Sequence, residues 1–172
     1  GFPASARKLP KNRQAMCGSF RESLEVHEAW MATKASAEAL GAKIVVFESP
    51  ASFQPGPDRL RDLYRFFKKA ARGKLTFVWH PRGAEWSSLG DKVCAELGLI
   101  RAFDPLRQEP PRKGVFLYMR PVIARMGAMS VANMATIAAA CADVPAYVAL
   151  SHRASFRDAE RLKDTLGSKR AK

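Results

Sequence analysis

The chain has 172 residues, is 47% hydrophobic, and carries a formal net charge of +13 with an isoelectric point near 10.2. This composition excludes global disorder, and the length allows one domain but is short for a complete (β/α)8 barrel, which needs about 200 to 250 residues. No hydrophobic run reaches the roughly 20 residues of a membrane span, and the basic excess indicates an anionic partner such as nucleic acid, or alternatively a basic proteome or organelle matrix.

Three widely spaced cysteines without metal-ligand spacing favour an intracellular, reducing compartment. Cys94 and Cys141 lie in apolar helical stretches, where we expect them to act as small hydrophobic residues.

The N-terminal stretch 1–22 is basic and loop-like, so it is predicted to be an arm that lies on an anionic surface or a solvated connector. Its candidate RNA-binding residues are Arg7, Lys8, Lys11 and Arg13. A helix over 23–40 follows, capped by Ser23 and ended by Gly41, and then an apolar strand over 42–48.

A second helix is predicted over 57–71, beginning at Pro57 and ended by Gly73. One face of it is apolar, and the other is a basic stripe that either binds phosphates or is simply solvated. The stripe consists of Arg61, Arg65, Lys68 and Arg72. A strand over 75–80 comes next, then a helix from about Ser88 to Gly98 with Ser88 and Asp91 as a capping box, then a strand over 100–104.

The last third contains strands over 115–120 and 147–152, separated by a helix over 130–142 that has no charged residue. We expect another chain to cover this helix, the alternative being an alanine surface that stays open. A final helix over 156–166 is predicted to be capped by Ser155 and Asp158. The predicted organisation is a basic arm (1–22), a partial barrel (23–167) and a basic tail (168–172).

Each of the five strands is apolar and ends in a polar residue, and helices separate most of them. Such strands are typical of a parallel sheet buried on both faces. The predicted fold class is therefore α/β, a partial TIM-type barrel whose five parallel strands correspond to the C-terminal part of the barrel.

Several segments resemble the YecE-like family, also called domain of unknown function 72, which has a TIM-barrel fold and no settled activity. The resemblance implies that the first three barrel strands would lie before residue 1. It rests on Ala39-Leu40-Gly41-Ala42-Lys43-Ile44-Val45-Val46-Phe47, Pro50-Ala51-Ser52-Phe53, Trp79-His80-Pro81-Arg82-Gly83 with Trp86, and Glu96-Leu97-Gly98-Leu99 with Asp104-Pro105.

The chain departs from the family pattern at four strand ends. The family has glutamine at Glu48 and glutamate at His80, and its Arg-Leu-His-Gly and paired-asparagine motifs are replaced here by Tyr118-Met119-Arg120-Pro121 and Ser151-His152. Arg82, Trp86 and Asp104 are retained. The resemblance therefore implies a barrel rim whose chemistry has been lost or changed.

If the rim were active, its candidate residues would be Glu48, His80, Arg82, Asp104, Arg120 and His152. The two histidines and two carboxylates are ligand types that suit Zn²⁺ or Mn²⁺, but their spacing is generic, so we predict no metal and no other cofactor. Arg82 and Arg120 could bind phosphate. A structural ion pair of Arg82 with Asp104 or Glu85 is favoured over that role.

The favoured hypothesis is a non-catalytic structural subunit of a large assembly, an organellar ribonucleoprotein such as the mitochondrial ribosome, in the mitochondrial matrix. Its partners would be protein subunits and RNA. Two alternatives stay open: a barrel-type metal-dependent enzyme acting on phosphate-containing or nucleic-acid substrates, and an accessory subunit of a respiratory-chain complex.

Overall fold

The computed structural model describes residues 9–111, 115–124, 126–142 and 144–170. The chain forms two compact units, Gly1–Leu99 and Ile100–Lys172, each with its own core. In the part of the chain that the structure describes, no helix is long and apolar enough to cross a membrane.

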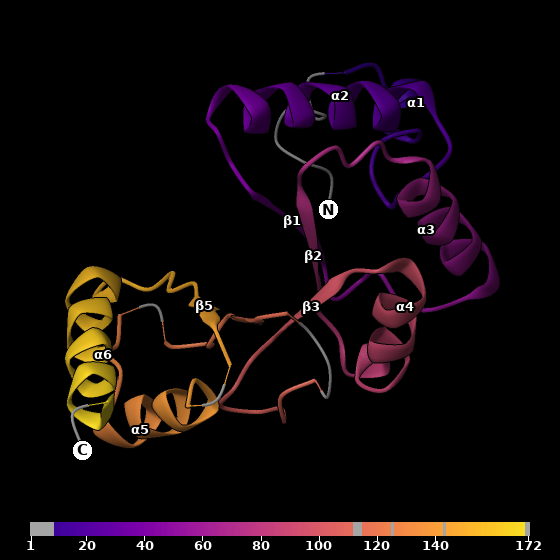
Figure 1. The fold of residues 1–172 in the computed structure, drawn as a ribbon. Helices are drawn as coiled ribbons and strands as arrows, with labels where there is room; N and C mark the ends of the chain where they lie inside the picture. Colours follow the sequence, from indigo (N-terminus) through magenta and orange to yellow (C-terminus); the bar gives the residue numbers. More distant parts are fainter. Residues whose placement is uncertain (1–8, 112–114, 125, 143, 171–172) are drawn as a thin grey trace. The chain divides into compact units, whose positions relative to one another are not determined.

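The first unit alternates helices and strands around an aromatic core (Figure 1). Its elements are α1 (Lys11–Gln14), α2 (Leu24–Ala39), β1 (Ile44–Ser49), α3 (Pro57–Lys69), β2 (Thr76–Pro81), a 3-10 turn (Ala84–Trp86) and α4 (Leu89–Leu97). The expected signals act at the ends of α2, because the Ser23 hydroxyl accepts a hydrogen bond from the Val26 N–H and Gly41 takes a φ of 63°.

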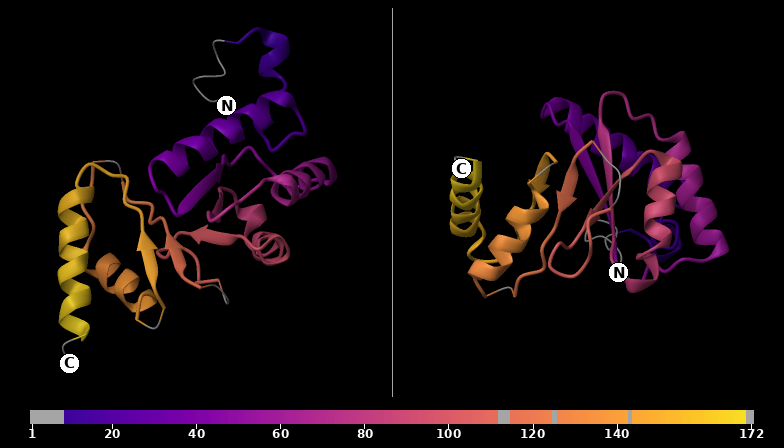
Figure 2. Two further views of the ribbon diagram at one scale, coloured as in Figure 1. Left: turned by 45° about the horizontal axis from the view of Figure 1, so that its top comes forward. Right: turned by 60° about the horizontal axis from the view of Figure 1, so that its bottom comes forward.

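The second unit contains three short strands and two helices. They are β3 (Ile100–Phe103), β4 (Leu117–Met119), α5 (Val131–Ala140), β5 (Ala146–Val148) and α6 (Ser155–Arg170). Helices α5 and α6 lie side by side in every view (Figure 2) and bury a common apolar cluster that includes Met134, Ile137 and Leu162.

The strand order is β1-β2-β3-β4-β5, and the described registers of β1–β2, β3–β4 and β4–β5 are all parallel. This order confirms the α/β class and the five-stranded parallel arrangement of a partial TIM-type barrel. Among the strands that the structure describes, the order is open, with β1 and β5 at its two ends.

The core of the first unit is built from rings that the sequence distributes over α2, β1, α3 and β2. The Phe47 and Phe67 centroids lie 5.0 Å apart in an edge-to-face arrangement, as do those of Trp79 and Trp86. Trp79 and Trp86 are fully buried and Trp30 is 5% exposed, so all three indole rings pack within this core.

The turn that leads into α2 has three successive residues with positive φ: Gly18 (72°), Ser19 (57°) and Phe20 (58°). Such backbone is unfavourable for residues other than glycine. The turn directs Phe20 into the core, where its ring centroid lies 5.1 Å from that of Phe67 and 5.3 Å from that of Phe66.

Two predicted helix caps are wrong. Ser88 makes no capping hydrogen bond because its backbone is already helical (φ −92°, ψ −41°), continuing from the preceding 3-10 turn. Asp158 does not cap α6, since its carboxylate is fully buried and binds other groups, described below. Helix α6 also runs past Leu166 to Arg170, into the segment expected to be a tail.

Candidate functional site

The ends of β1 and β2 bring three sequence-predicted residues together. Glu48 lies opposite His80 in the parallel register, and the Arg82 guanidinium forms an ion pair with the Glu48 carboxylate. The partner expected for Arg82 was Asp104 or Glu85, and that expectation is wrong because the register places the end of β2 beside the end of β1 instead. Arg82, which the family retains, and Glu48, which replaces the family's glutamine, therefore neutralise each other's charge.

A buried hydrogen bond locks the same strand ends. The Trp79 indole N–H donates to the Ser49 hydroxyl over 2.9 Å, and both side chains are almost fully buried. The Arg82 backbone N–H donates to the Ser49 carbonyl over 3.0 Å, which extends the parallel ladder past the strand. Two hydrogen bonds of Ser49 therefore join the ends of β1 and β2, and this contribution of Ser49 was not expected from the sequence.

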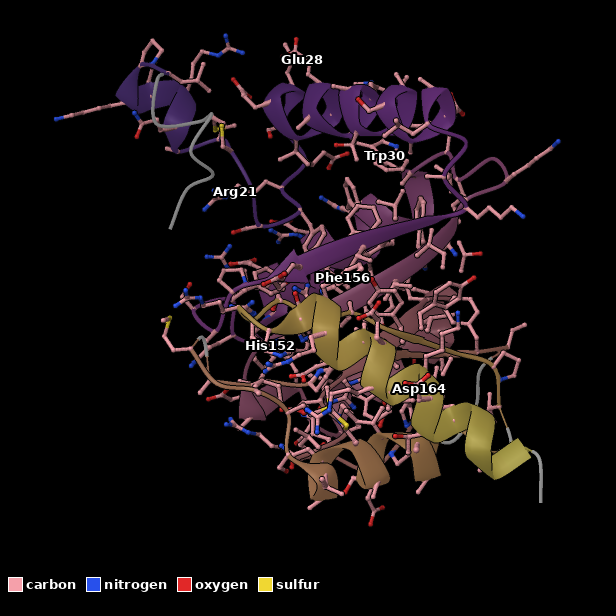
Figure 3. All side chains as sticks on the ribbon, turned by 90° about the vertical axis from the view of Figure 1, so that its left-hand side faces the viewer. Arg21, Glu28, Trp30, His152, Phe156 and Asp164 are labelled. Carbon is pink, nitrogen blue, oxygen red and sulfur yellow. The ribbon has the colours of Figure 1, made fainter. Side chains whose placement is uncertain are left out.

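An open hollow of about 1160 Å³ runs along β1. Its walls come from α2, the segment before it, β1, the loop after β1 and α3. Rings of Phe20, Trp30, Phe47 and Phe53 line it, and six consecutive residues, 45–50, contribute to one wall. Figure 3 shows Trp30 on the side of α2 toward the strands, and its indole N–H, which is buried, has no acceptor among the described residues.

The arginines around the hollow differ in whether they pair with a carboxylate. Arg13 lies 2.9 Å from a Glu25 oxygen and 3.8 Å from a Glu28 oxygen. Arg21 instead donates to the Ala15 and Cys17 carbonyls, and Arg59 lies over the Phe53 ring.

In the second unit the strand-end residues serve local structure. Asp104 is 7% exposed, and its Oδ1 accepts from the Leu106 N–H over 3.0 Å, which forms the turn after β3. A second Asp104 oxygen lies 3.5 Å from Arg107. Arg120 is half-buried, and its backbone N–H donates to the Phe103 carbonyl over 2.8 Å.

His152 belongs to a buried network that the sequence did not reveal. Its Nε2 lies 2.8 Å from the Asp158 carboxylate, which also accepts from the Met129 N–H (2.6 Å) and from Arg161 (2.9 Å). The Met129 N–H is the largest cause, ahead of His152 and Arg161, of a lowered Asp158 pKa of about 2, against the opposing effect of burial. The sequence did contain one indication that Asp158 is buried. Asp158 and Leu162 are four residues apart on α6, so both face the core.

The predicted RNA-binding side chains are largely engaged within the chain. Arg61 pairs with Asp58 and Asp62, Arg65 pairs with Glu22, and Lys68 lies over the Tyr64 ring. Arg72 donates to the Leu97 and Gly98 carbonyls at the end of α4. Arg13 is also paired, Lys11 is exposed, and Arg7 and Lys8 lie outside the described residues.

Two further site expectations concern metals and cysteines. Among the residues whose placement is described, no group of three or more His, Cys, Asp or Glu side chains could hold a metal ion. Cys17, Cys94 and Cys141 are free thiols. Burial raises the pKa of the Cys141 thiol, as expected for a small hydrophobic side chain.

Comparison with known proteins identifies the fold and nothing finer. No protein-family model matches the sequence, and no curated protein matches it. The structure is similar to the crystal structure of a DUF72 family protein from Enterococcus faecalis V583, with a TM-score of 0.63, 11% sequence identity and 86% of this chain covered. The chain spans 66% of that protein's length. The expected DUF72-like fold is thereby confirmed.

Proposed function

We propose that the chain is a non-catalytic structural subunit of a large ribonucleoprotein assembly, an organellar one such as the mitochondrial ribosome, built on a degenerate YecE-like barrel. The observation that supports the proposal is the set of partners that the polar residues at the strand ends have within the chain. Glu48 and Arg82 pair with each other, and His152 is buried against Asp158, so these side chains are engaged within the chain rather than free to act as acid, base or ligand groups.

Charge supports an anionic partner. The chain has 29 lysines and arginines but 16 aspartates and glutamates, so 13 basic side chains would lack an acidic partner even if every carboxylate formed one ion pair. Exposed basic side chains without a described acidic partner occur in both units. They include Lys11, Lys43, Lys74, Lys92, Arg153, Arg157 and Lys163. Contacts of such side chains with RNA phosphates release counterions and give an affinity that depends steeply on salt.

The alternatives have weaker support. A metal-dependent enzyme acting on phosphate-containing or nucleic-acid substrates would need a ligand set, and none occurs in the described part of the chain. An accessory role in a respiratory-chain complex would suit the exposed apolar residues of α5, where Val131 is 75% exposed among alanines. It does not explain the high net positive charge of the chain. Whether another chain covers α5 stays a prediction.

The test is sucrose-gradient sedimentation of extract from the source cells, with the chain followed by antibody. We expect co-migration with a large particle at about 50 mM salt, and release after ribonuclease treatment or at high salt. A chain that stays at the top of the gradient in low salt, with or without ribonuclease, would contradict the proposal.

A double variant tests whether the residues at the strand ends are structural or catalytic. Glu48→Gln with Arg82→Gln removes the ion pair at the strand ends. We expect this double variant to enter the particle as the wild type does, because the proposed role needs no rim chemistry. If the wild type has a measurable catalytic turnover and the double variant loses it, the chain is instead an enzyme.

A further inference from the structure

A second cavity, of about 270 Å³, lies between the start of α2 and the end of α3. Phe20, Trp30 and Phe66 line both this cavity and the hollow along β1, so they form the wall between the two. The other lining residues come from α2, the turn before it and the end of α3, and none of the described ones belongs to β1. The cavity therefore does not depend on the edge of the sheet.

Small and flexible side chains leave this space open. Helix α3 ends at Lys69, because the backbone of the next residue, Ala70, is extended (φ −63°, ψ 113°). Ala70 and Ala71 then line the cavity with side chains of a single carbon, which leave the space toward α2 unfilled. On the other side Met31 of α2 is 47% exposed, although it is large and apolar. Since its unbranched side chain adapts to its surroundings, it can close on an apolar group.

The size and the inner wall of the cavity specify a small ligand with a flat apolar body. At about 30 Å³ per water molecule, the cavity has the volume of roughly nine waters, so it fits a ligand of about ten non-hydrogen atoms. The inner wall consists of aromatic rings, and an aromatic ligand gains from edge-to-face or offset contacts with such rings. A mostly apolar cavity with a few polar groups is typical of a small-molecule site.

The charges at the cavity favour an anion. Arg21, Arg65 and Lys69 line it together with a single carboxylate, that of Glu22. Glu22 accepts one hydrogen bond from Arg65 (3.2 Å) and one from Lys69, and Lys69 is the largest cause of the lowered pKa of Glu22. Glu22 is therefore ionised at neutral pH, and it offsets one of the three cations. An ammonium carries three N–H donors and a guanidinium five, so donors remain for a second anion.

We propose that this cavity binds a small aromatic carboxylate, with its ring against Phe20, Trp30 and Phe66 and its carboxylate on Lys69 at the mouth. A monoanion suits the site better than a phosphate dianion, because Glu22 lies beside the same cations and repels a further negative charge. This binding site stands beside the proposed structural role and does not rest on it.

The test titrates the isotope-labelled full chain with phenylacetate and follows the NMR shifts of its backbone and indole N–H groups. Phenylacetamide keeps the ring and the shape without the charge, and acetate keeps the charge without the ring. We expect phenylacetate to bind with a Kd below about 1 mM, and the two controls to bind at least about fivefold more weakly. The shifts should centre on Ala70, Ala71 and the Trp30 indole. No binding of phenylacetate, equal affinity for either control, or shifts centred elsewhere would overturn the proposal.

Two adjacent lysines of α3 provide a matched pair of variants. Lys69 lines the cavity, whereas Lys68 does not line it and lies over the Tyr64 ring. Lys69→Gln should weaken phenylacetate binding about threefold, as expected for an exposed ion pair, and should leave phenylacetamide binding unchanged. Lys68→Gln should change neither. Equal weakening of phenylacetate binding by both variants would show that the overall charge of the chain attracts the ligand, which would overturn the assignment of the site.

Blocking the cavity gives a test that does not depend on charge. Ala71 is exposed and lines the cavity, so Ala71→Phe should fill the space without disturbing the core, and thermal unfolding checks that its stability is that of the wild type. Binding of both phenylacetate and phenylacetamide should be lost. Ala35→Phe, at an exposed position of α2 outside the cavity, is the control. Phenylacetate binding that survives Ala71→Phe would overturn the proposal, whatever the gradient experiment shows about the ribonucleoprotein role.

Discussion

Asp158 is the residue whose ionisation contributes most clearly to stability. Its native pKa of about 2 lies below the ordinary value of 3.8, so its stabilising effect is complete above about pH 4 and is lost as the pH falls toward 2. The difference corresponds to about 2 kcal/mol. We expect urea unfolding at pH 2 to 5 to show this loss in the wild type.

Asp158→Asn should remove that pH-dependent part and lower the free energy of unfolding at pH 7 by about 2 kcal/mol or more, because the carboxylate is buried beside His152 and Arg161. Asp164→Asn, an exposed position on the same helix, is the control (Figure 3). Parallel pH profiles of the wild type and Asp158→Asn would contradict the assignment.

Ser49 matters because it satisfies the buried Trp79 indole N–H. Ser49→Ala leaves that donor without its acceptor inside the core, which should lower the free energy of unfolding by about 1–3 kcal/mol. Ser52→Ala, at an exposed position three residues on, should change it by less than about 0.5 kcal/mol. Chemical denaturation of both variants compares the two positions.

At the scale of elements, three serines before helices provide a matched set. Ser23 and Ser130 accept hydrogen bonds from backbone N–H groups of α2 and α5, whereas Ser88 makes no such bond. Ser23→Ala and Ser130→Ala should each cost about 1 kcal/mol of stability. Ser88→Ala should be near neutral in the same thermal-unfolding assay, and an equal loss for all three would show that capping is not the cause.

The sequence predicts the elements well because their signals are local. The apolar period of α3, Pro57 at its start, and Gly98 in left-handed conformation (φ 59°) after α4 all act within a few residues. The site depends on contacts between distant residues, which no local pattern carries. Ser49 meets Trp79 only through the parallel register, and Asp158 carries a Ser-x-x-Asp pattern that also fits a helix cap.

At the scale of the whole molecule, RNA affinity should follow the basic residues that have no acidic partner. Lys11→Gln with Lys68→Gln should reduce the slope of log affinity against log salt for single-stranded RNA by about 1.4, since each phosphate contact contributes about 0.7. Arg13→Gln with Arg61→Gln removes the same charge from paired positions and should change the slope less. Filter binding at about 50 to 200 mM salt measures both.

The left-handed turn at Gly18, Ser19 and Phe20 has a kinetic consequence. Two non-glycine residues hold an unfavourable backbone, at about 1 kcal/mol each, only because the Phe20 ring is packed among four others. Releasing that ring recovers the backbone energy, so this segment should open more often than the rest of the first unit. Amide hydrogen exchange in this turn should therefore be faster than exchange through global unfolding of the first unit.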